Sequence, residues 1–89
     1  MSTVEVIFLS EGDCPNCNRI RGVLDQVRHE YRHVDVNEIH PADVMGEMLA
    51  AEHRIEELPA LIVNGRLRLV GDMPEKRIRG EVQRARCRS

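Results

Sequence analysis

Strand patterns and helix patterns alternate along the chain, and their order limits the possible folds more than any other feature. Residues 4–9 form a short, β-branched, apolar run that predicts a central buried strand. From residue 14, apolar side chains recur at helical spacing with charged side chains between them. The apolar positions of this helix are Ile20, Val23, Leu24, Val27 and Tyr31. Residues 32–36 alternate as a second strand, which we expect Asn37 to end.

A second helix is predicted after this strand. Pro41 suits a first helical turn, and an apolar stripe continues from it to residue 56. The stripe comprises Val44, Met45, Met48, Leu49 and Ile55. We interpret the two methionines as core filler rather than as ligands.

A hairpin and a third helix complete the chain. Residues 61–63 and 67–70 have strand patterns and are joined by Asn64-Gly65, a turn in which both positions need a positive φ. Asp72 and Glu75 have the spacing of a capping box that opens the last helix. We expect this helix to bury Ile78, Val82 and Ala85.

The resulting order, β-α-β-α-β-β-α, predicts an α/β fold. A right-handed crossover makes the first two strands parallel, and the hairpin makes the last two antiparallel. We therefore expect a four-stranded mixed sheet flanked by three helices. We expect residues 1–89 to form one domain, because a chain of this length has no room for a second core. Gly22 interrupts the first helix at a cost of about 1 kcal/mol relative to Ala, so we expect a tight packing contact to require it.

The segment Cys14-Pro15-Asn16-Cys17 lies where the first strand meets the first helix. Near the N-cap, the sulfur of Cys14 is close to unpaired N–H groups and to the positive helix end, which favour a thiolate. Pro15 fits the first helical position. Cys17 lies one turn later, with Cβ atoms about 5–6 Å apart in a regular helix, so a small adjustment closes a disulfide. The spacing predicts a redox pair in which Cys14 attacks and the more buried Cys17 resolves the mixed disulfide.

Residues 6–17 resemble the glutaredoxin-like and small thioredoxin-like members of the thioredoxin superfamily, whose Cys-Pro-x-Cys follows a first strand. Residues 58–65 resemble the superfamily's second signature, a hydrophobic residue and a cis-proline that lead into the third strand. The resemblance covers residues 4–85. It implies a thioredoxin fold and a dithiol–disulfide oxidoreductase without cofactor or metal. It also implies that Pro59 packs beside the cysteine pair and that the main chain of Leu58 pairs with substrate.

Several positions depart from the family patterns. Thioredoxins have a Trp and a buried acid where this chain has Asp13 and Phe8, so neither of these aids is present. Glutaredoxins have a basic residue where this chain has Glu11, and a double glycine where it has Val70-Gly71, although Asp72 matches. These differences argue against glutathione binding.

Composition bears on partners and compartment. Residues 1–65 hold 12 acidic residues against 5 arginines, whereas residues 66–89 hold 8 basic residues against 3 acidic ones. We interpret the basic end as a solvated helix face, because Phe8 and Tyr31 are the only aromatics and offer no stacking platform for nucleic acid. No apolar run is long enough for a secretory signal or a membrane span. We expect a cytoplasmic monomer that binds neither nucleic acid nor membrane.

In that compartment a close cysteine pair serves redox catalysis or metal binding rather than a structural disulfide. The expected partners are proteins with disulfides and an electron donor, either a reductase or a low-molecular-weight thiol. Two alternatives use the same residues differently: a metal or iron–sulfur carrier, although zinc needs four ligands, and a non-catalytic thioredoxin-fold adaptor. Cys87, in a basic tail, is interpreted as a passive free thiol.

Overall fold

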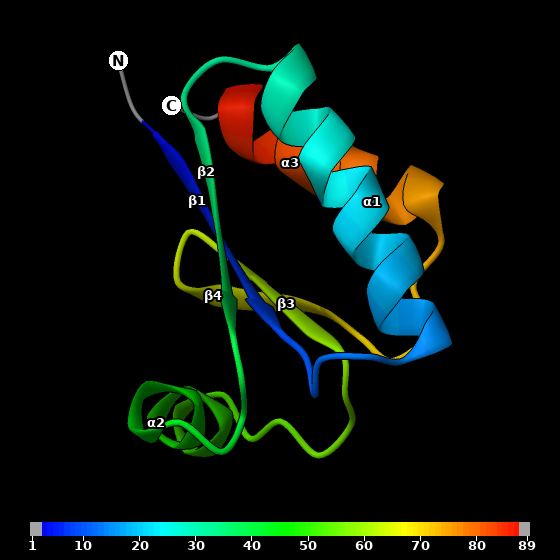
Figure 1. The fold of residues 1–89 in the computed structure, drawn as a ribbon. Helices are drawn as coiled ribbons and strands as arrows, with labels where there is room; N and C mark the ends of the chain where they lie inside the picture. The colour runs from blue at the N-terminus through cyan, green and yellow to red at the C-terminus, as the bar shows by residue number, and fades with distance from the viewer. Residues whose placement is uncertain (1–2, 88–89) are drawn as a thin grey trace.

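The computed structural model describes residues 3–87 and has the predicted order of elements (Figure 1). The elements are β1 (Val4–Leu9), α1 (Pro15–Glu30), β2 (Val34–Ile39), α2 (Val44–Glu52), β3 (Ala60–Val63), β4 (Arg66–Val70) and α3 (Glu75–Cys87). The four strands form one sheet in the order β2-β1-β3-β4. The β1–β2 pair is parallel and the other two pairs are antiparallel, which confirms the predicted mixed sheet.

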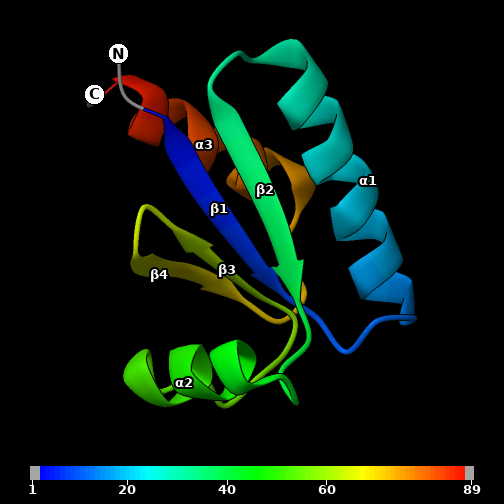
Figure 2. The same ribbon diagram turned by 60° about the vertical axis from the view of Figure 1, so that its left-hand side comes forward.

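The strand β1 lies between a larger and a smaller core, and four of its six residues are buried. Its side chains alternate between the two. Val4, Val6 and Phe8 join the larger core under α1 and α3, whereas Ile7 and Leu9 contribute to the smaller core on the α2 side. Figures 1 and 2 show α1 and α3 side by side on one face of the sheet, with α2 apart from them. Within residues 3–87, no helix has the length and apolarity that a bilayer crossing requires.

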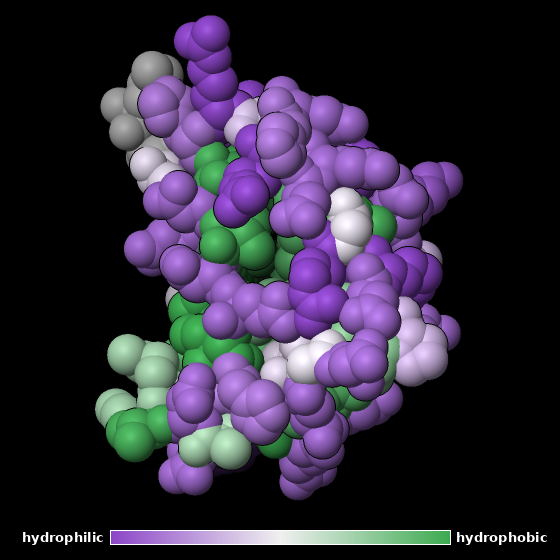
Figure 3. Space-filling model, in the orientation of Figure 1, coloured by the Kyte–Doolittle hydropathy of each residue, from purple (hydrophilic) through white to green (hydrophobic). Residues whose placement is uncertain are grey.

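The helix α2 differs from the prediction in its start and in its burial. Pro41 lies in the turn before the helix, and Asp43 is the N-cap. The side chains of Val44, Met45 and Met48 are 75%, 55% and 61% exposed, so the interpretation of the methionines as core filler was wrong. Figure 3 shows an apolar patch over α2, in the place that Figure 1 gives this helix.

The reason for this exposure is that α2 meets the rest of the protein along a narrow face. Gly46 is buried against the backbone of His40 and Pro41. Of the predicted apolar stripe, Leu49 and Ile55 pack against the smaller core, and Ile55 lies beyond the end of the helix. A nine-residue helix fixed by a glycine on one side leaves its opposite face to solvent.

The start and the end of β2 differ from the prediction, whereas the hairpin turn agrees with it. β2 begins at Val34, after a turn in which His33 has a φ of 62°. Asn37 does not end β2, because it pairs with Ile7 of β1 and the strand continues to Ile39. An edge strand tolerates a polar residue whose side chain faces water. The Asn64-Gly65 turn is confirmed, with φ values of 51° and 78°.

The start of α3 also differs from the prediction. The helix begins at Glu75, directly after Pro74, whose carbonyl oxygen accepts hydrogen bonds from the N–H groups of Arg77 and Ile78. The predicted capping box is therefore wrong. Asp72 lies outside the helix and binds Arg19 of α1 instead. The predicted inward residues Ile78 and Val82 are buried, and Ala85 is half-buried against the same core.

Two glycines give opposite predictions for stability. Gly22 is exposed within α1, and a Cβ there would meet no atom within 4 Å, so the expected packing requirement is absent. We expect Gly22→Ala to raise the free energy of unfolding by about 0.5–1 kcal/mol, measured by urea denaturation. The matched variant Gly46→Ala drives a Cβ into the His40–Pro41 backbone and should destabilise by about 1–3 kcal/mol. A neutral result for Gly46→Ala would contradict this packing.

Candidate functional site

The two predicted cysteines lie together at the start of α1. Cys14 is the N-cap residue, in an extended conformation, and Pro15 occupies the first helical turn as predicted. A disulfide joins Cys14 to Cys17, with the Cα atoms 5.0 Å apart. Cys14 is half-buried, whereas Cys17 is 1% exposed and belongs to the larger core. The predicted difference in exposure between the two sulfurs is confirmed, and Asn16 lies half-buried between them.

The helix start supplies electrostatic support to the outer sulfur. The backbone N–H of Cys17 donates a hydrogen bond of 3.0 Å to the Sγ atom of Cys14. The first turn of α1 contains no acidic residue, so no carboxylate there offsets the positive potential of the helix end at the Cys14 sulfur. When the disulfide is reduced, the same N–H group and helix end favour a thiolate on Cys14 over one on the buried Cys17.

A polar network holds the loop that carries Cys14. The guanidinium of Arg21 donates to both carboxylate oxygens of Glu38 on β2, at 2.7 and 2.6 Å, and to the carbonyl oxygen of Gly12, at 2.9 Å. The hydroxyl of buried Ser10 donates to Glu38 at 2.8 Å and accepts from the N–H of Gly12 at 3.1 Å. The loop between β1 and Cys14 is thus tied to the neighbouring strand.

Sequence reasoning missed this network. It placed Arg21 on the solvent face of α1 and Ser10 in a polar turn, and both descriptions are correct locally. A spacing of 17 residues between Arg21 and Glu38 gives no signal in the sequence. Only the parallel β1–β2 pairing, which sets Ile39 beside Leu9, brings Glu38 to the end of β1.

The second predicted segment lies at the same end of the sheet. The Leu58–Pro59 bond is cis, as the resemblance implied. Ala60, the next residue, pairs with Leu9, the last residue of β1, so Pro59 lies where the chain leaves β1 toward Cys14. Figure 2 shows the start of β3 beside the end of β1. The carbonyl oxygen of Pro59 accepts a hydrogen bond of 2.7 Å from the N–H of Gly71. Within residues 3–87, the N–H and carbonyl groups of Leu58 have no hydrogen-bond partner.

The loop after β4 connects the proline segment with the first turns of α1. Gly71, which binds Pro59, has a φ of 73°, and the Glu57 carboxylate occupies the space where a side chain on Gly71 would lie. Met73 lies two residues after Gly71, and its carbonyl oxygen accepts a hydrogen bond of 2.6 Å from Arg19 of α1. Met73 is buried in the same core as Cys17. The structure therefore brings the predicted site residues to one end of the sheet and links them through residues 71–73.

Within the described residues, the fold adds no ligand to Cys14 and Cys17 that would support the metal-carrier alternative. Among residues 3–87, no group of three or more His, Cys, Asp and Glu side chains is placed to hold a metal ion. Cys87, the third cysteine, is exposed and unbonded at the end of α3.

Comparisons with known proteins define the class to which this fold and site belong. The family model described as a thioredoxin domain matches residues 2–82, so the chain belongs to the thioredoxin-domain family. A comparison with curated proteins finds no match. The fold and the bonded cysteine pair together support thiol–disulfide redox chemistry in general.

Solved structures show the same fold at low sequence identity. A thioredoxin O2 from Arabidopsis thaliana in the oxidized state has a TM-score of 0.74 and 16% identity, covering 93% of this chain and 75% of that one. A mutant thioredoxin from Halobacterium salinarum has a TM-score of 0.73 and 17% identity, covering 94% and 75%. A malarial protein has a TM-score of 0.70 and 17% identity, covering 94% and 98%.

The Arg21–Glu38 pair makes stability depend on pH. Hydrogen bonds from Arg21 lower the pKa of Glu38 in the folded state, with a further contribution from Ser10. A lowered folded pKa adds stability above the unfolded pKa, and that stability is lost as the pH falls through the folded value. We expect the difference in unfolding free energy between the natural protein and Glu38→Gln to shrink between about pH 6 and pH 3.

Urea denaturation at several pH values measures this difference. The matched control is Glu47→Gln, because Glu47 is an exposed acid on α2 and its side chain makes no ion pair within the described residues. Its effect should stay nearly constant over the same range. Parallel curves for the natural protein and Glu38→Gln would contradict the role of the network.

Proposed function

We propose that the protein reduces or exchanges disulfides in other proteins through Cys14 and Cys17. The observation that carries this proposal is the arrangement of the sulfurs, with half-buried Cys14 at the N-cap of α1 and its bonded partner, Cys17, in the core. The Cys14 sulfur is accessible to a substrate, whereas the buried Cys17 sulfur is accessible only to Cys14. This division of access is what a two-step exchange requires.

The proposed cycle begins with the reduced pair. The Cys14 thiolate attacks one sulfur of the substrate disulfide, the substrate S–S bond breaks, and the leaving sulfur takes a proton as a thiol. Cys17 then loses its proton and attacks the Sγ atom of Cys14. The bond between Cys14 and the substrate breaks, and the second substrate thiol leaves. Two electrons have passed to the substrate, and the Cys14–Cys17 disulfide remains.

The segment before the cis-proline supports binding of an extended peptide. The main chain of Leu58 keeps its donor and its acceptor without a partner inside the described chain, at the end of the sheet that carries Cys14. An extended segment of a substrate pairs with such groups as an added strand does. In this proposal Leu58 and Pro59 position the substrate disulfide, and Cys14 reacts with it.

The charge around the site favours a protein reductase over glutathione as the electron donor. Glu11 and Asp13 are exposed in the loop before Cys14, and Glu57 is exposed beside the cis-proline segment. Glutathione carries a net negative charge and needs cationic partners at its carboxylates. We also propose that this cycle runs in the cytoplasm, where reductases keep thiols reduced, and that the protein acts as a monomer.

The reaction order predicts that Cys17→Ser accumulates a mixed disulfide through Cys14. Without the resolving sulfur, the first exchange occurs and the second does not, so insulin reduction should fall by roughly 100-fold or more. Mass spectrometry after mixing the reduced variant with oxidised insulin should detect a covalent adduct at Cys14. Cys14→Ser should give neither adduct nor turnover.

Cys87→Ser is the matched control, because it removes the third cysteine and leaves the pair intact. Its activity should equal that of the natural protein. A Cys17→Ser variant that forms no adduct, together with a natural protein that does not reduce insulin, would favour the adaptor alternative.

The electron donor is tested by offering the oxidised protein two reducing systems. We expect thioredoxin reductase with NADPH to restore the thiols, and glutathione with its reductase to be slower by about tenfold or more, because of charge and the missing cationic partner. Free thiols are counted with a chromogenic reagent. Glu11→Lys should speed the glutathione reaction and leave the enzymatic one nearly unchanged. Faster reduction of the natural protein by glutathione would contradict the proposed donor.

A further inference from the structure

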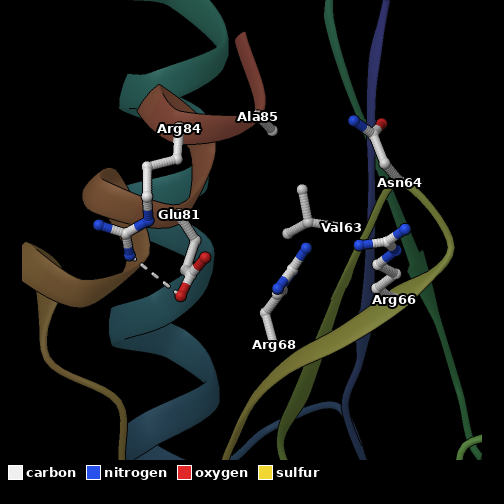
Figure 4. A pocket seen from close by; sticks show the side chains of 7 residues that line it. All are labelled: Val63, Asn64, Arg66, Arg68, Glu81, Arg84 and Ala85. Atoms are coloured by element: carbon white, nitrogen blue, oxygen red, sulfur yellow. Dashed lines mark ion pairs between the residues drawn. The ribbon is translucent and has the colours of Figure 1, made fainter. Parts of the chain in front are cut away.

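A cavity of about 270 Å³ lies between α3 and the β3–β4 hairpin (Figure 4). It is lined by Val63, Asn64, Arg66, Arg68, Glu81, Arg84 and Ala85. Val63 pairs with Val6 toward the start of β1, whereas Cys14 follows the end of that strand. The cavity is therefore at the opposite end of the sheet from the cysteine pair. Its volume is just below the range of about 300–1,000 Å³ that is usual for small-molecule sites.

Positive charge in this cavity exceeds what the fold neutralises. Arg84 forms an ion pair of 3.1 Å with Glu81, the one acidic side chain of the lining. The side chains of Arg66 and Arg68 form no hydrogen bond or ion pair within residues 3–87. Figure 4 shows the guanidinium of Arg68 beside Val63, in the space between the hairpin and α3. The cavity therefore contains two arginine side chains that pair with no acidic side chain of the described residues.

The other described arginines of α3 either have a partner or lie outside the cavity lining. Arg79 binds Glu30 at 2.6 Å and Glu75 at 2.8 Å, and the guanidinium of Arg86 lies 4.3 Å from the ring centre of Tyr31. Arg77 is exposed and does not belong to the cavity lining. The cavity therefore differs from a generally basic surface. Its two hairpin arginines, Arg66 and Arg68, have no partner among the described residues, whereas most arginines of the neighbouring helix α3 are paired.

The backbone of β4 directs both arginines into the cavity. Arg66 pairs with Val63, so its side chain lies on the α3 face of the sheet. Arg68, two residues later, faces the same way by alternation. A β-bulge at Arg68 then lets Leu69 return to the core on that same face. The backbone positions of the two arginines are therefore fixed, on one side by pairing within the hairpin and on the other by buried Leu69.

The remaining lining groups fit a ligand that has several acceptor oxygens on a small organic body. The Asn64 side-chain oxygen accepts from the N–H of Glu5 at 2.9 Å, which leaves its NH₂ group to donate. Val63 is buried and Ala85 is half-buried, and both add apolar surface to the cavity lining. A phosphate monoester carries a charge of about −1.5 to −2 and three strong acceptor oxygens, which matches two free guanidinium groups and an amide.

We infer that this cavity is a binding site for a small phosphate monoester, held by Arg66 and Arg68. Each guanidinium presents paired donors that bind phosphate oxygens bidentately. Arg84 keeps Glu81 neutralised, so the carboxylate does not repel the ligand. Because the site lies at the far end of the sheet, ligand binding leaves the cysteine pair open to its substrate.

The test is an NMR titration of the ¹⁵N-labelled full chain with inorganic phosphate as the probe. Amide shifts should saturate and concentrate at residues 63–68 and 81–85. Arg68→Gln should weaken binding by about tenfold or more, since it removes charge-assisted hydrogen bonds, and Arg66→Gln provides a second, independent variant. The matched control Arg77→Gln removes the same charge from α3 outside the cavity and should change the affinity by less than about twofold.

Several outcomes would overturn the inference. The first is that sodium chloride at equal ionic strength reproduces the amide shifts. The second is that Arg77→Gln weakens binding as much as Arg68→Gln does. The third is that the amide shifts do not saturate as phosphate is added. Succinate that binds as tightly as phosphate would reject a phosphate site in favour of a general carboxylate site. The amide spectrum of Arg68→Gln outside residues 63–68 and 81–85 reports that the variant is folded, and it should match that of the natural protein. The redox proposal and this one therefore fail independently.

Discussion

The burial of β1 between two strands and two cores is the constraint on which the site depends. β1 pairs with β2 on one side and with β3 on the other, and its side chains fill both cores. The position of its last residue, Leu9, is therefore fixed in every direction. Leu9 pairs with Ile39 and with Ala60, so the loop to Cys14 and the segment that ends in Pro59 leave the sheet at one point. The site forms there because strand register leaves the two segments no other place.

Apolar packing determines the fold, whereas polar contacts set the loops at the site. Arg21 and Glu38 are each about one-third exposed, at 35% and 34%, so solvent screening limits the contribution of their ion pair to global stability to about 0.2–1 kcal/mol. The same two side chains nevertheless hold the loop before Cys14 against β2, because Arg21 also donates to the carbonyl oxygen of Gly12 and Glu38 accepts from the hydroxyl of Ser10. Arg19 does the same for the loop after β4. These arginines occupy the first turns of α1, so the helix that carries the cysteines also fixes the segments around them.

The sequence predicted those parts of the structure in which local pattern and tertiary contact agree. The Asn64-Gly65 turn, the buried face of α1 and the cysteine positions follow from short-range rules, and all three are confirmed. Leu67 and Leu69 show where such rules stop. Alternation puts them on the same face, but the bulge at Arg68 sends Leu67 to the smaller core and Leu69 to the larger one. The prediction that the methionines of α2 lie in the core was wrong for a related reason, because an apolar stripe does not show which helix face contacts the sheet.

The uneven charge of the sequence becomes a separation of charge in space. Glu11 and Asp13 lie in the loop before Cys14, whereas Arg66 and Arg68 lie at the other end of the sheet. Exposed charges at the two ends are screened from each other within about 8–10 Å at physiological salt, so each end presents its own local potential. An anionic ligand is attracted to the hairpin end and repelled from the cysteine end. The same separation that disfavours glutathione at Cys14 therefore favours a phosphate group beside Arg68, and a single charge distribution supports both proposals.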